Sequence, residues 1–321
     1  MTSKHPHCVA IEPDLVASAT GEAPAPVAAL VDDHVARCVA CREDFQRYRA
    51  IDALTGEIRV APVPVADEAA ARARLTSRLA DLRRRMLRYR IFRSPLGPIL
   101  LARSEEGVAL VEYLQSANVK ASRLTRLGDE VELVEDRDQL ERLTRELTEF
   151  IEGRRAKLDW PLDLRLVRGD FDRTVLRATS GIPYGAVSSY AAVARQLGKP
   201  SAVRAVAQAL RWNPLPLVIP CHRVIGSGGT LTGYAGNKLT LKQRLLSVEG
   251  IPTVRSTGEF QIARQATYAR DYNDAEYCLP TCGSISKRSL AEVQLFGSRE
   301  SAEAAGFRPC TSCRPDLHPL G

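Results

Sequence analysis

The chain has 321 residues, of which 45% are hydrophobic and 26% are charged, and its formal net charge is +7 at pH 7. This composition is typical of a globular protein with two or three domains, and no apolar stretch approaches the roughly 18 residues that a membrane span requires. The first residues lack the apolar core of a secretory signal, so we expect a cytoplasmic protein that does not enter a membrane. The positive charge suits an anionic partner such as DNA, although many soluble proteins are mildly basic.

The eight cysteines fall into three groups along the chain. Three lie in the first fifty residues, Cys221 stands alone, and four lie near the C-terminus. Cysteines of cytoplasmic proteins more often bind metals or act as nucleophiles than form disulfides. The three groups therefore predict three functional modules.

The N-terminal group has the spacing His34-x3-Cys38-x2-Cys41. On a helix, His34 and Cys38 lie on one face, and Cys41 follows one turn later. Either Cys8 or His7 could supply a fourth ligand from upstream. Such a set of nitrogen and sulfur ligands is typical of tetrahedral structural zinc, and the alternative is a set of free thiols on an ordinary helix.

Residues 56–88 have the composition of a connecting segment. Pro62 and Pro64 interrupt regular structure, and the apolar spacing from Asp67 to Arg88 predicts a helix. The arginines of this helix could contact DNA or form a solvated face.

Residues 89–165 predict a small mixed region of strands followed by a helix. The expected strands lie at residues 89–92, 99–102 and 108–113. An amphipathic helix is expected at 140–151, ended by Gly153. We expect this region to support the fold and to carry no chemistry.

Residues 170–250 predict a mainly helical region. The expected helices lie at residues 171–179, 189–197 and 202–210. The last two are separated by the turn Gly198-Lys199-Pro200 and form a helix-turn-helix, a pattern that any small helical domain can contain.

Cys221 follows an apolar run at residues 215–219 and directly precedes His222. The thiolate is the nucleophilic form of cysteine, and a neighbouring histidine, with a pKa of about 6.5, can act as its base. Because adjacent side chains of an extended segment point to opposite faces, we expect the two to interact through a bend or a bridging water. The alternatives are a buried, inert cysteine and the nucleophile of a cysteine hydrolase, although the local signatures of papain-like and caspase-like proteases are missing.

The C-terminal group consists of two close pairs, Cys278-x3-Cys282 and Cys310-x2-Cys313. Two cysteine pairs at this spacing predict a four-cysteine zinc site.

The residues around Cys221 resemble those of the O6-alkylguanine-DNA alkyltransferase family. The resemblance covers roughly residues 89–251, and it depends on the segments Arg204-Ala205-Val206, Asn213-Pro214, Ile219 to Ile225, Gly233-Tyr234 and Lys242 to Gly250. It implies that alkyl (methyl) groups move from O6-alkylguanine in DNA to Cys221. No residue could remove the thioether, so each molecule should react once.

The same resemblance implies a role for each residue of the catalytic site. Cys221 is the nucleophile, His222 activates it through water, and Glu249 orients His222. Tyr234 protonates the leaving guanine, and Asn213 stabilises the turn beside the site. The interval between Tyr234 and Glu249 is one residue longer than in the usual pattern of the family.

The resemblance also implies a set of DNA-binding residues. The target base must be flipped out of the duplex. Arg204 would fill the gap that the base leaves, Tyr190 would help to push the nucleotide out, and Arg223 belongs to the same set. Without the resemblance, Arg204 would be interpreted as a solvated arginine on a helix.

Two further resemblances flank this region. Residues 5–55 resemble the zinc-binding anti-sigma fold, which implies a sigma factor or another regulatory protein as a partner. The segments around the four C-terminal cysteines resemble the metal-binding domain of the bacterial adaptive-response protein Ada, in which the first cysteine binds zinc and also accepts a methyl group from DNA phosphotriesters. That position is Cys278 here, and Leu279 stands where the family usually has arginine.

We therefore expect an α+β multidomain protein. It would contain an alkyltransferase with a small mixed N-terminal subdomain and a helical, helix-turn-helix C-terminal subdomain, flanked by two small zinc-binding modules. The expected segments are an anti-sigma-like module (1–55), a linker helix (56–88), the alkyltransferase N-terminal subdomain (89–165), the active-site and DNA-binding domain (166–252) and an Ada-like zinc-binding domain (265–318).

The expected function is direct repair of double-stranded DNA that carries alkylated bases, with possible methylphosphotriester repair at Cys278. Two structural zinc ions are expected, and the chemistry at Cys221 would not require them. The alternative is a DNA-binding regulator that senses alkylation and acts through a protein partner.

Overall fold

The computed structural model describes residues 6–60, 65–122, 124, 131–236, 238–256 and 258–320. The prediction that Pro62 and Pro64 interrupt regular structure falls outside these residues. The chain divides into two compact units, residues 1–77 and residues 78–321. Within the described residues, none of the helices is both long enough and apolar enough to cross a bilayer.

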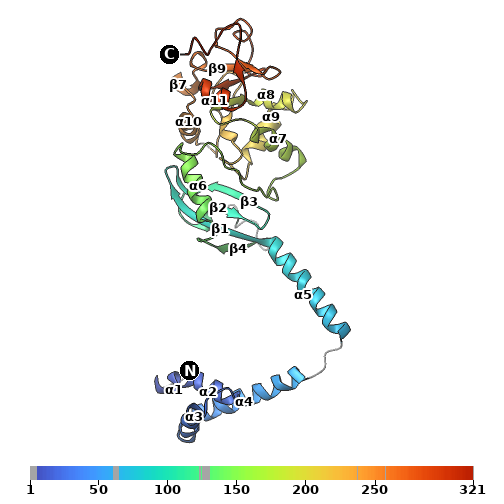
Figure 1. Ribbon diagram of the computed structural model, residues 1–321, viewed down its shortest axis with the longest axis vertical. Coiled ribbons are helices and arrows are strands. Elements are labelled where there is room, and N and C mark those ends of the chain that lie inside the picture. The colour runs from blue at the N-terminus through green and yellow to red at the C-terminus, as the bar shows by residue number, and fades with distance from the viewer. Residues whose placement is uncertain are drawn as a thin grey trace. The chain divides into compact units, whose positions relative to one another are not determined.

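The N-terminal unit is helical (Figure 1). Its elements are α1 (Pro6–Ala10), α2 (Glu12–Ala19), α3 (Ala25–Arg37) and α4 (Val39–Val60). Of its described residues, the buried hydrophobic ones are Leu15, Val31 and Cys41, one each from α2, α3 and α4. The Tyr48 hydroxyl donates a hydrogen bond to the Glu12 carboxylate at 3.0 Å, which joins α4 to α2.

Helix α5 (Val65–Arg85) leads into the second unit. The helix expected at residues 67–88 is therefore present but ends three residues early, because Met86 begins a strand. Leu75, Leu79 and Leu82 give this helix its apolar spacing, but all three are exposed.

The second unit begins with a four-stranded sheet in the order β3-β2-β1-β4. The strands are β1 (Met86–Ser94), β2 (Gly97–Arg103), β3 (Val108–Tyr113) and β4 (Glu132–Glu135). The first three confirm the expected strands and pair antiparallel, whereas β4 pairs parallel to β1 and was not predicted. A 3-10 turn, η1 (Val119–Ala121), follows β3.

Alternation along β2 separates two cores, because successive side chains of a strand point to opposite faces. Ile99 and Leu101 pack with α6 (Glu141–Ile151), and Leu100 and Ala102 pack in a second cluster on the opposite face. Helix α6 confirms the helix expected at residues 140–151, and its buried positions follow the helical period.

The helical region of the second unit contains the expected helix pair. Its helices are α7 (Asp170–Ser180), α8 (Tyr190–Gln196), α9 (Val203–Arg211) and α10 (Leu239–Val248). Two short strands, β5 (Ala186–Ser189) and β6 (Val224–Ile225), lie between them and pair in parallel. The Ser189 side chain begins α8 by accepting a hydrogen bond from Ala192 N–H at 3.0 Å, as an N-cap residue does.

The C-terminal region, expected to be a flanking zinc-binding module, shares a sheet with this helical region. Its elements are β7 (Thr253–Ser256), β8 (Glu259–Ile262), η4 (Arg264–Ala266), β9 (Tyr268–Asp271), β10 (Glu276–Tyr277), β11 (Val293–Phe296), α11 (Arg299–Ala304) and β12 (Arg308–Pro309). The sheet has the order β6-β5-β11-β9, and β11 pairs antiparallel with both β5 and β9. The Ser189 hydroxyl also donates to the carbonyl of Leu290 at 2.7 Å.

The end of β11 packs directly against the loop that follows α10. Gly297 N–H donates to the carbonyl of Gly185 at 2.9 Å, and a Cβ at Gly297 would clash with the backbone of Gly250. A side chain is excluded because two backbone segments meet there.

We expect Gly297→Ala to lower the free energy of unfolding by about 1–3 kcal/mol, the usual cost of overpacking. Gly228→Ala is the matched control, because a Cβ at Gly228 meets no atom within 4 Å, and it should change stability by no more than about 0.5 kcal/mol. Thermal and urea unfolding measure both changes. Equal free energies of unfolding for the two variants would contradict the close contact between Gly297 and the backbone of Gly250.

Candidate functional site

A cavity of about 550 Å³ opens in the helical region of the second unit. Its walls come from α8, α9, the turn at Cys221 and the loop from Thr232 to Gly236. Cys221, Tyr190, Tyr234 and Arg204 all line this cavity, so the structure brings together four residues that the sequence placed in one site. The volume is in the range of pockets that hold small organic molecules, which includes a single nucleobase.

A sharp turn places Cys221 at the cavity. Asn213 stabilises this turn, because its Nδ2 donates to the carbonyl of Ile219 at 3.0 Å and its Oδ1 accepts from Leu215 N–H at 2.9 Å. Cys221 then begins a single turn of 3-10 helix. The segment is bent and not extended, and the described hydrogen bonds include none between the side chains of Cys221 and His222.

The carboxylate of Glu249 lies between His222 and Arg223, and all three side chains are buried. His222 Nε2 is 2.8 Å from Glu249 Oε1, and Arg223 donates to both carboxylate oxygens, from Nε at 2.8 Å and from Nη2 at 2.9 Å. Gly185 N–H adds a donor at 3.3 Å, and Arg223 Nη1 donates to the carbonyl of Ile182 at 2.7 Å. Arg223, expected to contact DNA, is 6% exposed and instead pairs with Glu249 inside the protein.

Burial and charge set the protonation states of this group. Burial raises the pKa of Cys221 and lowers the pKa of His222, so both are neutral near pH 7. Burial also disfavours the charged form of Glu249, but the interactions of its carboxylate with His222 and Arg223 outweigh this effect and bring the pKa of Glu249 to about 2. His222 Nδ1 is buried and makes no hydrogen bond to any described residue, so it can accept a proton from a nearby thiol or water.

The remaining predicted residues lie on the cavity wall. The Tyr190 hydroxyl is 3.4 Å from the carbonyl of Thr232, and Arg204 is exposed on α9. The Tyr234 hydroxyl is 2.8 Å from the hydroxyl of Tyr113, which comes from β3. A region expected only to support the fold therefore contacts this site.

Lys242 on α10 is a site residue that the sequence analysis missed. It is fully buried, and its Nζ donates to the carbonyls of Val224 at 2.5 Å and Thr232 at 2.8 Å. Burial lowers the pKa of Lys242 to about 8. The available sequence signal was its position, three and four residues before the buried Leu245 and Leu246, which places it on the inner face of the helix.

The four C-terminal cysteines form one cluster. One sulfur atom from each of Cys278, Cys282, Cys310 and Cys313 lies within 4.8 Å of the others. Sulfurs at the corners of a zinc tetrahedron with bonds of about 2.3 Å are about 3.8 Å apart, so this donor set fits the ion. Cys278 is 4% exposed, and Cys313 is the most exposed of the four.

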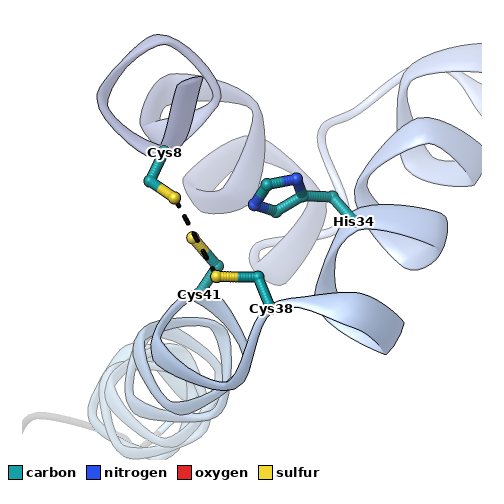
Figure 2. Close-up of side chains that lie close together, drawn as sticks. All are labelled: Cys8, His34, Cys38 and Cys41. Carbon is teal, nitrogen blue, oxygen red and sulfur yellow. Dashed lines mark hydrogen bonds between the residues drawn. The ribbon is translucent and has the colours of Figure 1, made fainter. Parts of the chain in front are cut away.

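The N-terminal ligands also converge, as Figure 2 shows. Cys8 from α1, His34 from α3, Cys38 between α3 and α4, and Cys41 from α4 have their ligand atoms within 4.8 Å of one another. The sulfurs of Cys8 and Cys38 are 3.9 Å apart, close to the edge of a zinc tetrahedron. Cys8 occupies the fourth position, and the side chain of His7 lies outside the described residues.

Three protein-family descriptions match the second unit. Residues 87–164 match the ribonuclease-like domain of 6-O-methylguanine DNA methyltransferase, and residues 170–251 match its DNA binding domain. Residues 261–316 match the metal binding domain of Ada.

Individual relatives agree with these matches. The chain is 38% identical over 162 residues to a methylated-DNA–protein-cysteine methyltransferase of Methanosarcina acetivorans, covering 50% of this chain and 97% of the relative. It is 36% identical to the constitutive enzyme of that name from Bacillus subtilis, covering 51% of this chain and 95% of the relative. Among solved structures, the O6-methylguanine methyltransferase of Mycobacterium tuberculosis is 35% identical, with a TM-score of 0.45, over 51% of this chain and 93% of that one.

The low pKa of Glu249 leads to a pH-dependent prediction for stability. A carboxylate whose pKa is lower in the folded state stabilises that state above its unfolded pKa, and this contribution is lost as the pH falls through the folded pKa. Glu249→Gln should therefore lower the free energy of unfolding by about 3–5 kcal/mol at pH 7, because it leaves Arg223 buried without its counter-charge. The difference from wild type should shrink as the pH falls from about 4.5 towards 2.

Urea unfolding at a series of pH values measures this difference, with Glu259→Gln on the exposed surface of β8 as the control. If Glu249→Gln lowers the free energy of unfolding by the same amount at pH 7 and at pH 3, the neighbours of Glu249 do not lower its pKa.

Proposed function

Since this chain belongs to the family of methylated-DNA–protein-cysteine methyltransferases, we propose that it repairs double-stranded DNA directly, by moving alkyl groups from O6-alkylguanine to the sulfur of Cys221. The observation that carries the proposal is the position of Cys221, at a cavity large enough to hold a nucleobase and next to a buried His222–Glu249–Arg223 group. This arrangement supplies a nucleophile, a base and the group that orients the base.

The bonds and protons balance in a single displacement. The thiol of Cys221 is neutral near pH 7 because burial raises its pKa, so its proton must leave as the sulfur attacks. His222 accepts this proton, directly or through water, and Glu249 holds the imidazole in place. The bond between sulfur and the alkyl carbon forms while the carbon–oxygen bond breaks, and the leaving guanine takes a proton from Tyr234. The proton held by His222 then passes through solvent to the Tyr234 oxygen and restores the phenol.

The cavity can receive the base only if the base leaves the DNA stack, at a cost of a few kcal/mol. Arg204 is exposed on α9 at the cavity, where its side chain can fill the gap in the duplex. Tyr190 stands at the start of α8 on the same cavity and displaces the nucleotide. The product is a thioether that no neighbouring group can hydrolyse, so each molecule reacts once.

Intact-mass spectrometry with peptide mapping tests this function. After incubation with DNA containing O6-methylguanine, the wild-type protein should gain one methyl group on Cys221, and unmethylated DNA is the control. Cys221→Ala should bind the DNA without removing the methyl group. Removal of the methyl group by Cys221→Ala would disprove the assignment.

A second acceptor, Cys278, is proposed from the match to the metal binding domain of Ada. Its burial requires that the cluster open towards a DNA phosphotriester before the sulfur can react. Cys221→Ala protein incubated with DNA carrying methylphosphotriesters should gain one methyl group at Cys278. If that protein gains none, the cluster only stabilises the fold.

Each of the two ligand clusters is proposed to hold one structural zinc ion. Cys8, His34, Cys38 and Cys41 hold one, and Cys278, Cys282, Cys310 and Cys313 hold the other. A bound zinc ion keeps its cysteine ligands as thiolates and links distant segments of the chain. Among the described residues, Cys221 lies outside both clusters, and we propose that methyl transfer to it uses neither ion.

Elemental analysis of the full-length protein should find two zinc ions per chain. Combined replacement of Cys38 and Cys41 by serine should remove one ion, combined replacement of Cys310 and Cys313 should remove the other, and Cys221→Ser should remove none. The first of these variants should also retain methyl transfer to Cys221. If either double variant still holds two zinc ions, or if the wild-type protein is purified without metal, the proposal of two zinc sites is wrong.

A regulatory role through a protein partner stays a prediction. The family matches described above begin at residue 87, so neither they nor the described contacts bear on a sigma factor or another partner of the N-terminal unit. The division of the chain into the five expected segments stays a prediction in the same way.

A further inference from the structure

Trp212 is an exposed tryptophan at the C-terminal end of α9, the second helix of the helix-turn-helix. It is 44% exposed, whereas the other tryptophan of the chain, Trp160, is 7% exposed. The guanidinium carbon of Arg168, which lies two residues before α7, is 3.6 Å from the centroid of the Trp212 ring. Among the described residues no carboxylate forms an ion pair with Arg168, and Asp170 pairs instead with Arg173 at 3.4 Å. The Trp212–Arg168 pair therefore presents an aromatic ring and a positive charge to solvent.

The pair lies at one edge of the exposed face of α9. Successive residues of a helix are about 100° apart around its axis, so Arg204 and Arg211 lie near the centre of this face. Val203 lies about 100° from Arg204 on one side, and it lines the Cys221 cavity. Trp212 lies about 80° from Arg204 on the other side. The helix carries no acidic residue, so a face that suits an anionic partner extends from the cavity to the Trp212–Arg168 pair.

A helix that enters a groove of duplex DNA has one strand on each side. The edge of α9 beside the cavity faces the strand that carries the alkylated base, so the opposite edge faces the complementary strand. We propose that the Trp212–Arg168 pair binds the backbone of the complementary strand, with the Trp212 ring packed on a deoxyribose and the Arg168 guanidinium paired with a phosphate. This inference rests on the proposed function, because it requires that the cavity receive a base from a DNA duplex.

The geometry of the pair suits this role. An arginine that contacts a phosphate fixes the position of a protein on the duplex without reading its sequence. The Trp212 ring already holds the guanidinium in place, so less conformational freedom is lost when the phosphate binds. The part of the ring that stays exposed can bury apolar surface against the sugar.

A contact with the complementary strand serves base flipping. When the alkylated nucleotide leaves the stack, its partner loses a base pair. A hold on the opposite backbone keeps that strand in place while Arg204 fills the gap. The contact should therefore matter for duplex DNA and not for a single strand that carries the same base.

The first test measures binding, in full-length protein that also carries Cys221→Ala so that no alkyl group is transferred. The variants are Trp212→Ala, Trp212→Phe and Arg168→Gln. Arg255→Gln is the matched control, because Arg255 also lies over an aromatic ring, that of Phe260 at 5.8 Å, in the β7–β8 hairpin.

We expect Trp212→Ala to weaken binding to a duplex containing O6-methylguanine roughly fivefold to tenfold, and Trp212→Phe to restore most of the loss. Arg168→Gln should reduce the slope of log affinity against log salt concentration by about 0.9, the value of one phosphate contact. Arg255→Gln should change neither quantity. Affinity for the single strand that carries O6-methylguanine should be the same for all variants.

The second test identifies the strand. Duplexes with uncharged methylphosphonate links around the lesion, in either the complementary strand or the lesion strand, are bound to the parent protein and to Arg168→Gln. The effect of Arg168→Gln should disappear when the links lie in the complementary strand and persist when they lie in the lesion strand.

Tryptophan fluorescence gives a direct readout of the contact. Acrylamide should quench Trp212 less when the duplex is bound than when the single strand is bound. The Trp212→Phe protein supplies the signal of the buried Trp160, which is subtracted.

Several results would overturn the inference. They are an unchanged salt dependence for Arg168→Gln, equal losses of affinity for duplex and single strand, an equal effect of Arg255→Gln, or a loss of the Arg168→Gln effect only with links in the lesion strand. If Trp212→Ala with Cys221 intact also slows alkyl transfer from free O6-benzylguanine, the ring shapes the cavity and does not bind the complementary strand. None of these results changes the mapping of the methyl group to Cys221, whereas failure of that mapping overturns the repair function itself.

Discussion

The repair site depends on the hydrogen bonds that the ionised carboxylate of Glu249 accepts. The carboxylate is buried and receives hydrogen bonds from His222, Arg223 and Gly185. A buried charge is tolerated only when such partners compensate its lost hydration. These partners come from the turn at Cys221 and from the loop before β5, whereas Glu249 directly follows α10. The site can therefore form only when all three segments are folded against one another.

The C-terminal region supports the same loop from the other side. The carbonyl of Gly185 accepts a hydrogen bond from Gly297, while its N–H donates to Glu249. Strand β11 also pairs with β5, whose last residue, Ser189, begins the helix that carries Tyr190. In this way β11 covers an edge of β5 that would otherwise be open to pairing with another chain. The region that carries the second cysteine cluster is thus part of the framework of the Cys221 cavity.

The two ligand clusters occupy different surroundings. The N-terminal cluster is packed against a core in which, among the residues that the structure describes, the buried members are Leu15, Val31 and the ligand Cys41. So small a core supplies little stability, and small units commonly depend on a metal ion or a cross-link. The C-terminal ligands Cys278 and Cys282 lie instead in a larger hydrophobic cluster that also contains residues of β11. Metal binding should accordingly contribute a larger share of the stability of the N-terminal unit.

The sequence by itself determined the features that local spacing encodes. These include the two cysteine clusters, the adjacency of Cys221 and His222, the helix pair and the amphipathic helix α6. Only the tertiary structure decided which distant groups meet. Glu249 reaches His222 across 27 positions, Tyr113 reaches Tyr234 across 121, and Ser189 reaches Leu290 across 101. The buried pairing of Arg223 likewise depends on Glu249. Helical and strand periods report which face of an element is apolar, but the partner of a polar side chain depends on how elements far apart in the chain pack together, and no local pattern records that.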